Sequence, residues 1–83
     1  MKILYFASIR AKTGIGTEEV TPPQSVTDVA SLIAWLKSRG GGFAEALGDS
    51  RIVRVAVNQE YAKPNHPVRA GDEIALFPPV TGG

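Results

Sequence analysis

The sequence contains no cysteine, and this absence excludes several kinds of chemistry together. Without a thiol the chain can form neither a disulfide, nor a cysteine nucleophile, nor a cysteine-ligated zinc site. Its one histidine, His66, stands between Asn65 and Pro67 with no carboxylate cluster beside it, so we expect it in a solvated loop. We therefore expect no metal site, no cofactor bound by this chain and no catalysis by its side chains.

The sequence also lacks a large excess of positive or negative charge, and it lacks long hydrophobic runs. The net charge is +1, and the nine lysines and arginines are spread along the chain, whereas a nucleic-acid site needs a basic patch. The apolar segment 3–7 is far shorter than the roughly 20 residues that span a membrane, and it is too short for the core of a signal peptide. We expect a cytoplasmic protein that binds neither nucleic acid nor a membrane.

The pattern of apolar residues predicts several strands and one main helix. The expected elements are strands over 3–7, 17–21, 52–57, 60–62 and 73–77 and a helix ended by the glycines at 40–42. The first two strands should form a hairpin through a looser connection at 13–16. Ser25 should cap the helix, with Asp28 reaching back to complete a capping box. Residues 43–47 should form only a short amphipathic turn, and Trp35 should lie at the edge of the core.

This element order predicts an α+β domain of the β-grasp type, a mixed sheet of four or five strands packed on one main helix. The first and last strands should lie parallel at its centre, because they are the apolar segments. Alternation then places these residues toward the helix: Ile3, Tyr5, Val53, Val55, Val57, Ile74 and Leu76. It places these on the opposite, open face: Leu4, Phe6, Arg54, Ala56, Ala75 and Phe77. That face is too apolar for a surface that meets only water, although a register slip of one residue would exchange the two faces.

The chain ends in a segment that cannot continue the sheet. Residues 78–83 read PPVTGG, and two successive prolines remove two backbone donors. We expect a globular domain over 1–79 and an extended tail over 80–83, the six residues after Phe77 reaching about 20 Å. Gly82 and Gly83 carry no side chain, so the terminal carboxylate can pass through a narrow channel and meet ATP. As an acyl-adenylate it could be attacked by a sulfur donor, and the resulting thiocarboxylate stores sulfur without cysteine.

The C-terminal segment resembles that of a known family. Residues 71–83 read GDEIALFPPVTGG and are similar to the end of molybdopterin synthase small subunits, which typically carry GDEVA, two apolar residues, PPV, Ser or Thr, and GG. Residues 3–10 and 55–61 add weaker similarity, so the resemblance covers most of the chain. It departs from the family at Ala11, where an acidic residue often follows the early arginine.

The resemblance implies a ubiquitin-like carrier that is not catalytic alone. Gly83 would be adenylated by an activating enzyme that uses ATP and magnesium, and would then be thiocarboxylated. The tail would insert into the large catalytic subunit, typically within a heterotetramer, and deliver sulfur to cyclic pyranopterin monophosphate in molybdenum cofactor biosynthesis. The tail residues expected to insert are Pro79, Val80, Thr81 and Gly82. The residues expected to contact the partner are Leu4, Phe6, Arg10, Arg54, Phe77 and Pro78.

Two other functions share these features. A sulfur carrier for thiamine synthesis or tRNA thiolation would have the same fold and Gly-Gly end, though less usually the preceding PPV. A ubiquitin-like modifier or a passive interaction module would use the glycine carboxylate for an isopeptide bond, or not at all.

Overall fold

Five strands form one mixed sheet in the order β2-β1-β5-β3-β4. The computed structural model describes residues 1–79. The strands are β1 (Lys2–Tyr5), β2 (Thr17–Glu19), β3 (Arg54–Val57), β4 (Glu60–Tyr61) and β5 (Glu73–Phe77). Strands β1 and β5 run parallel at the centre, and the other neighbouring strands are antiparallel. The β-grasp topology predicted from the sequence is confirmed.

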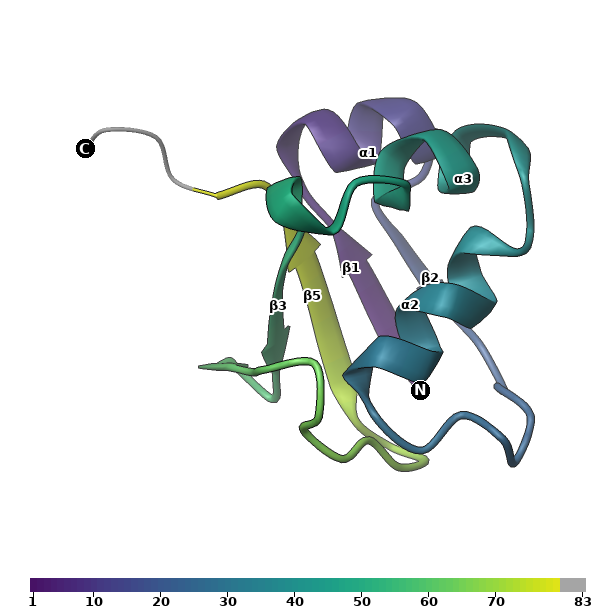
Figure 1. Ribbon diagram of the computed structural model, residues 1–83, viewed down its shortest axis with the longest axis vertical. Coiled ribbons are helices and arrows are strands. Elements are labelled where there is room, and N and C mark those ends of the chain that lie inside the picture. Colours follow the sequence, from purple (N-terminus) through teal and green to yellow (C-terminus); the bar gives the residue numbers. More distant parts are fainter. Residues whose placement is uncertain (80–83) are drawn as a thin grey trace.

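The helices cover one face and one end of this sheet. They are α1 (Ala7–Thr13), α2 (Val29–Lys37) and α3 (Gly41–Leu47), followed by the 3-10 turn η1 (Ser50–Ile52). Figure 1 shows α2 across the sheet and α1 and α3 together beyond the upper ends of the strands. Helix α3 contacts both α1 and α2, so it joins the two parts of the helical layer. Within residues 1–79 no helix is long and apolar enough to cross a bilayer.

The predicted hairpin was wrong in its connection: the first two strands are joined through helix α1 and not through a simple turn. Its sequence, ASIRAKT, buries a single side chain, Ile9, and the residue before it, Phe6, makes no side-chain cap hydrogen bond. The usual helix signals are therefore weak here. The helix ends at Gly14, whose left-handed φ of 82° lets its N–H donate to Arg10 O. The antiparallel pairing of β1 with β2 was nonetheless predicted correctly.

The start of α2 also differs from the prediction. Asp28, and not Ser25, is the cap: Ser31 N–H donates to Asp28 Oδ1 at 2.8 Å, and Asp28 N–H donates to Ser31 Oγ at 3.1 Å. The capping box therefore lies three residues later than predicted. At the other end Gly41 and Gly42 begin α3, so these glycines do more than stop α2 and residues 43–47 belong to a true helix.

The core lies between the sheet and α2, as the alternation predicted. The helix-facing residues of β1, β3 and β5 are all buried: Ile3, Tyr5, Val55, Val57, Ile74 and Leu76. They meet Val29, Leu32 and Leu36, the buried residues of α2. Val53 and Trp35 are half-buried at the core edge.

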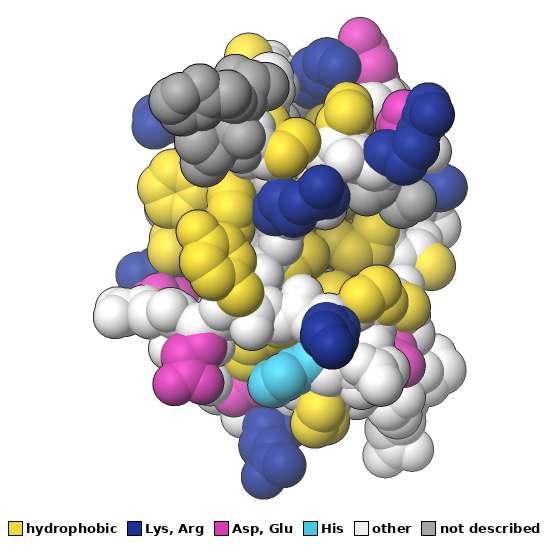
Figure 2. Space-filling view, turned by 60° about the vertical axis from the view of Figure 1, so that its left-hand side comes forward, with side chains coloured by type: hydrophobic (Ala, Val, Ile, Leu, Met, Phe, Trp, Pro, Cys, Tyr) yellow, Lys and Arg dark blue, Asp and Glu magenta, His cyan; other side chains and the backbone are white. Residues whose placement is uncertain are grey.

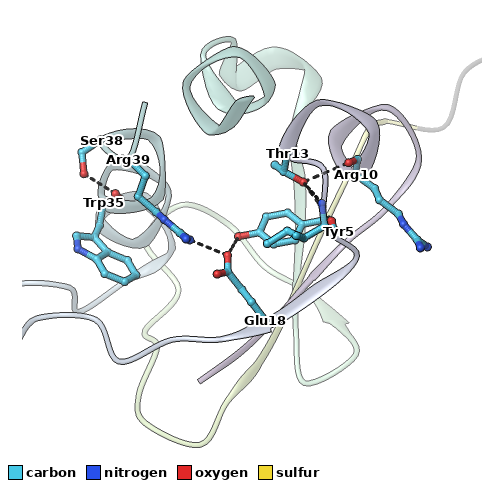
Figure 3. A network of polar contacts seen from close by, with 8 residues as sticks. Tyr5, Arg10, Thr13, Glu18, Trp35, Ser38 and Arg39 are labelled. Carbon is cyan, nitrogen blue, oxygen red and sulfur yellow. Dashed lines mark hydrogen bonds and ion pairs between the residues drawn. The ribbon is translucent and has the colours of Figure 1, made fainter. Parts of the chain in front are cut away.

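One polar cluster fastens the strands to the helices (Figure 3). Tyr5 OH and Arg39 Nη1 both donate to Glu18 Oε2, at 2.6 and 2.7 Å, and the Arg39 guanidinium lies 4.1 Å above the Phe43 ring. Burial, reinforced by the bond to Glu18, raises the pKa of Tyr5 far above its usual value. Burial also favours a higher pKa for Glu18, but the hydrogen bonds from Arg39 and Tyr5 outweigh it and the pKa of Glu18 falls below its usual value. Because its polar groups satisfy one another, we interpret this cluster as structural.

Candidate functional site

The open face of the sheet carries a continuous row of small and apolar side chains. The strand registers place Leu4 beside Ala75 and Ala75 beside Ala56. Ala56 in turn pairs with Tyr61 at the edge of the sheet. Residues that pair across strands point to the same side, so these four side chains share the open face. The face predicted from the sequence is confirmed for Leu4, Ala56 and Ala75, and the structure adds Tyr61 to it.

Aromatic side chains stand above this row. Phe77 lies opposite Arg54 in the next row, and its ring centroid is 5.8 Å from that of Tyr61. Tyr61 is 81% exposed and Phe6 47% exposed. Figure 2 shows a cluster of hydrophobic side chains on this side of the molecule. Large aromatic rings left in contact with water are typical of protein-binding surfaces.

The small residues leave a hollow beside the aromatic rings. It has a volume of about 230 Å³ and is lined by Ala56, Gln59, Tyr61 and Phe77. Gln59 lies in the turn between β3 and β4 with a left-handed φ of 72°, which turns the chain back before Tyr61. A hollow bordered by two aromatic rings can receive an apolar side chain of a partner.

Two arginines were predicted to contact the partner: Arg54 pairs with Phe77 and borders the open face, and Arg10 lies on α1. Arg54 Nη1 donates to the carbonyls of Arg51 and Val53, at 3.1 and 3.3 Å, which holds the guanidinium at the sheet edge. Arg10 is exposed on α1, and a Cβ on Gly16 would come within 3.0 Å of its Cζ, so the glycine leaves space for this side chain. Among residues 1–79 neither arginine forms an ion pair. Both cations are therefore available to an acidic partner.

Strand β5, the last of the sheet, ends beside this surface. Phe6 N–H donates to Leu76 O at 3.1 Å, and β5 ends one residue later, at Phe77. The prediction that the strand stops at the two prolines is confirmed, and both Pro78 and Pro79 are half-buried. The predicted tail residues Val80, Thr81 and Gly82 and the predicted reactive residue Gly83 lie outside the described residues. The division into a domain over 1–79 and a tail over 80–83 stays a prediction.

The sequence could have indicated Tyr61 only indirectly. Strand β4 has two residues, too few for an alternating pattern, and the face of Tyr61 follows from its pairing with Ala56. Of the other contact residues predicted, Leu4, Arg54 and Phe77 lie on the open face. Phe6 follows β1, exposed, and Arg10 lies on α1, which contacts β5. Their contacts with a partner stay a prediction.

The described residues offer no arrangement typical of a metal centre. Within residues 1–79 no three histidine, aspartate or glutamate side chains are placed to hold an ion. His66 lies in the loop between β4 and β5, half-buried, with Nδ1 2.8 Å from Pro67 O. What this part of the chain offers is an apolar surface bordered by Arg54, next to the end of β5.

Comparisons with known proteins agree over the whole chain. The model of the ThiS family matches residues 3–83. The molybdopterin synthase sulfur carrier subunit of Escherichia coli is 37% identical over 83 residues, covering 100% of this chain and 99% of the relative. The subunit of the same name from Homo sapiens is 32% identical over 88 residues, covering 100% of this chain and 93% of the relative.

Solved structures share the fold. A complex of subunits 1 and 2 of the molybdopterin-converting factor from Helicobacter pylori contains a chain that matches with a TM-score of 0.66 and 28% identity, covering 99% of this chain and 96% of that one. Small archaeal modifier protein 1 of H. volcanii matches with a TM-score of 0.69 and 27% identity, covering 96% and 97%. One of these similar proteins is thus a subunit in a complex, and the other is named as a modifier.

Proposed function

This chain belongs to the ThiS family, and from that premise we propose that it is the sulfur carrier subunit of a molybdopterin synthase. The observation that carries the proposal is the extent of the similarity. The alignment with the E. coli sulfur carrier subunit includes all 83 residues of this chain, and the family match runs to residue 83. Both matches therefore include the terminal Gly-Gly.

The chemistry proposed for Gly83 needs no side chain. A carboxylate oxygen of Gly83 attacks the α-phosphate of ATP, with magnesium bound by the activating enzyme, and pyrophosphate leaves. A sulfide donor then attacks the carbonyl carbon of the acyl-adenylate, and AMP leaves as the C–S bond forms. The product is a terminal thiocarboxylate whose sulfur can be transferred to cyclic pyranopterin monophosphate. A dithiolene contains two sulfurs, so two loaded carriers are consumed for each product.

The open face supplies the binding energy for this transfer in the proposal. Phe77 and Tyr61 would be covered by the partner, while Arg54 at the edge would meet an acidic group. The activating enzyme and the large subunit both need the terminus, so they would bind this face in turn. General acids and bases for the sulfur transfer would come from the large subunit.

The experiment that tests this function is mass spectrometry of the intact protein. The full-length chain is incubated with ATP, magnesium, the activating enzyme from the same genome and a sulfide source. We expect one oxygen of the C-terminal peptide to be replaced by sulfur, and we expect the loaded protein to convert the pyranopterin precursor when the large subunit is added. An unchanged mass with an activating enzyme that is active on its known carrier would contradict the proposal.

The likeness to a small archaeal modifier favours a second candidate, in which the Gly83 carboxylate is joined to a lysine of another protein. The same mass experiment separates the two candidates when a lysate is added. A modifier gives conjugates that survive reduction and denaturation, whereas a sulfur carrier gives the thiocarboxylate and no conjugates.

A further inference from the structure

A second apolar depression lies between α2 and the β3–β4 edge, around the corner from the open face. It has a volume of about 510 Å³, within the range of about 300 to 1,000 Å³ that is usual for ligand pockets. Ile33 of α2 forms one wall, and Val53, Val55 and Ala62 form the other. Figure 2 shows this hollow, with hydrophobic side chains at its base and basic side chains beside it. We call it the helix groove.

The helix groove is held open by backbone hydrogen bonds. The loop after β4 crosses the start of α2, where Ala30 N–H donates to Pro64 O at 2.9 Å and Val29 N–H donates to His66 O at 3.0 Å. Val68 N–H donates to Thr27 O at 3.1 Å on the same crossing. These bonds satisfy donors that a helix N-terminus would otherwise leave free, and they fix the distance between the two walls. The groove is therefore formed before any partner arrives.

The charges around the groove have one sign. Arg54 and Lys63 are the charged side chains that line it, and no acidic side chain does. Among residues 1–79 neither cation forms an ion pair. An occupant with aliphatic side chains and a carboxylate complements this combination of apolar base and basic rim.

The groove is continuous with the open face. Arg54 and Tyr61 line the helix groove, and both also belong to the open face, where Tyr61 borders the smaller hollow. Permanent complexes bury more than about 1,000 Å² on each partner, about a fifth of the 5078 Å² that this chain exposes. An interface of that size has to extend past the aromatic row, and the groove is the adjoining apolar surface.

From these observations we infer that the helix groove receives a segment of the large synthase subunit that carries aliphatic side chains and at least one carboxylate. The inference rests on the proposed function, because it assumes that the large subunit is the permanent partner. It adds a second contact region to the open face, on the other side of the β3–β4 edge.

The test measures the dissociation constant between the full-length chain and the large subunit by calorimetry. Ala30 and Ala34 are both exposed on α2, but only Ala30 lines the groove. We expect Ala30→Glu to weaken binding at least about tenfold, because it adds bulk and negative charge to the groove. The matched control Ala34→Glu should bind within about twofold of the unmodified chain. Both variants should keep the melting temperature of the unmodified chain.

A second variant keeps the test decisive if Ala30→Glu disturbs the fold. Lys63 is exposed in the loop, so Lys63→Glu leaves the core untouched. It should weaken binding at low ionic strength and have a smaller effect at high salt, because dissolved salt screens the interaction between exposed charges. Equal effects at both salt concentrations would contradict the charge complementarity.

The outcomes separate this inference from the proposed function. If Ala30→Glu binds the large subunit normally while Phe77→Asp does not, the groove is not part of the interface and the proposed function stands. If Ala30→Glu slows only the loading of sulfur by the activating enzyme, the groove belongs to that enzyme and the inference is overturned. If the unmodified chain does not bind the large subunit at all, the proposed function itself fails.

Discussion

Phe77 is the last residue of β5 and lies on the open face, directly before the two prolines. Its neighbours in β5, Ile74 and Leu76, are fully buried on the helix side, whereas Phe77 is half-buried on the other. Its ring meets Tyr61 and its backbone pairs with Arg54. A polar side chain at this position therefore acts on the surface and leaves the core intact.

We predict that Phe77→Asp weakens binding to the large subunit at least about tenfold, since it removes an aromatic ring from the centre of the open face. The free energy of unfolding should fall by only about 1 to 2 kcal/mol, from lost strand propensity and ring contact. Calorimetric binding and urea denaturation measure the two effects. Leu76→Asp is the contrast, because it buries a carboxylate in the core and should unfold the domain. Normal binding by a folded Phe77→Asp variant would show that the open face is not the docking surface.

Glu18 should make the stability of the domain depend on acid. Its pKa is lower in the folded protein than in the unfolded chain, so its charge stabilises the fold above its unfolded pKa, and this contribution is lost as the pH falls through the folded pKa. Glu18→Gln removes the charge but keeps the shape. It should cost less than about 1 kcal/mol at pH 7, because the pair with Arg39 is partly exposed, and still less at pH 3. Urea denaturation at the two pH values checks this, and an equal difference at both would contradict it.

At the scale of elements, the contact between α1 and α3 organises the upper end of the molecule. Gly40, with a left-handed φ of 76°, precedes α3. The second residue of α3 is Gly42, and there is no room for a side chain there. A Cβ on Gly42 would lie 1.9 Å from the carbonyl oxygen of Lys12 at the end of α1. The close approach of the two helices thus depends on one glycine.

Gly42→Ala should therefore destabilise the protein, although the same change inside an isolated helix stabilises it by about 1 kcal/mol. We expect a loss of about 1 to 3 kcal/mol, because a backbone atom must move to make room. Gly41→Ala is the comparison. Nothing lies within 4 Å of its Cβ, and only the strain of its φ of 53° remains. A higher melting temperature for Gly42→Ala would contradict the close packing of α1 and α3.

The cap of α2 provides a test of the same kind. Asp28→Ala should lower the melting temperature, because it leaves the Ser31 N–H without its side-chain acceptor. Ser25→Ala should leave the melting temperature unchanged, since Ser25 is exposed and lies before the capping box. A lower melting temperature for Ser25→Ala, with no change for Asp28→Ala, would show that Ser25 is the cap, as the sequence predicted.

At the scale of the whole molecule, the proposed function assigns binding to the folded body and chemistry to the terminus. All of the buried hydrophobic side chains among the described residues lie between Ile3 and Leu76, before the two prolines. The body would bring its partner to the terminus, and the terminus would carry the sulfur. Changes at the last residue should then affect chemistry and not folding.

An alanine added after Gly83 should abolish thiocarboxylate formation, because the activated carboxylate would lie one residue too far along its channel. The melting temperature and the affinity of the open face for the large subunit should not change. Intact mass after the loading reaction is the measurement, with the unextended chain as its control. Sulfur appearing on the extended terminus would contradict a defined role for Gly83.

The strands of the central sheet, their two faces and the motif at the terminus were predictable from the amino-acid sequence. Alternation has a period of two residues, so Ile3, Val55 and Ile74 could be assigned to the core from neighbouring letters alone. The Gly-Gly end and the prolines before it are likewise local features. They were sufficient to predict the family resemblance and the place where β5 ends.

The other features depend on contacts between distant parts of the chain. Helix α1 buries one side chain, Ile9, and depends on its contact with α3, which comes almost 30 residues later. Tyr61 joins the open face through its pairing with Ala56, and the helix groove exists because the loop after β4 is hydrogen-bonded to the start of α2. Each of these features is stabilised by contacts between segments far apart in the chain. The pattern of a few neighbouring residues does not predict such contacts.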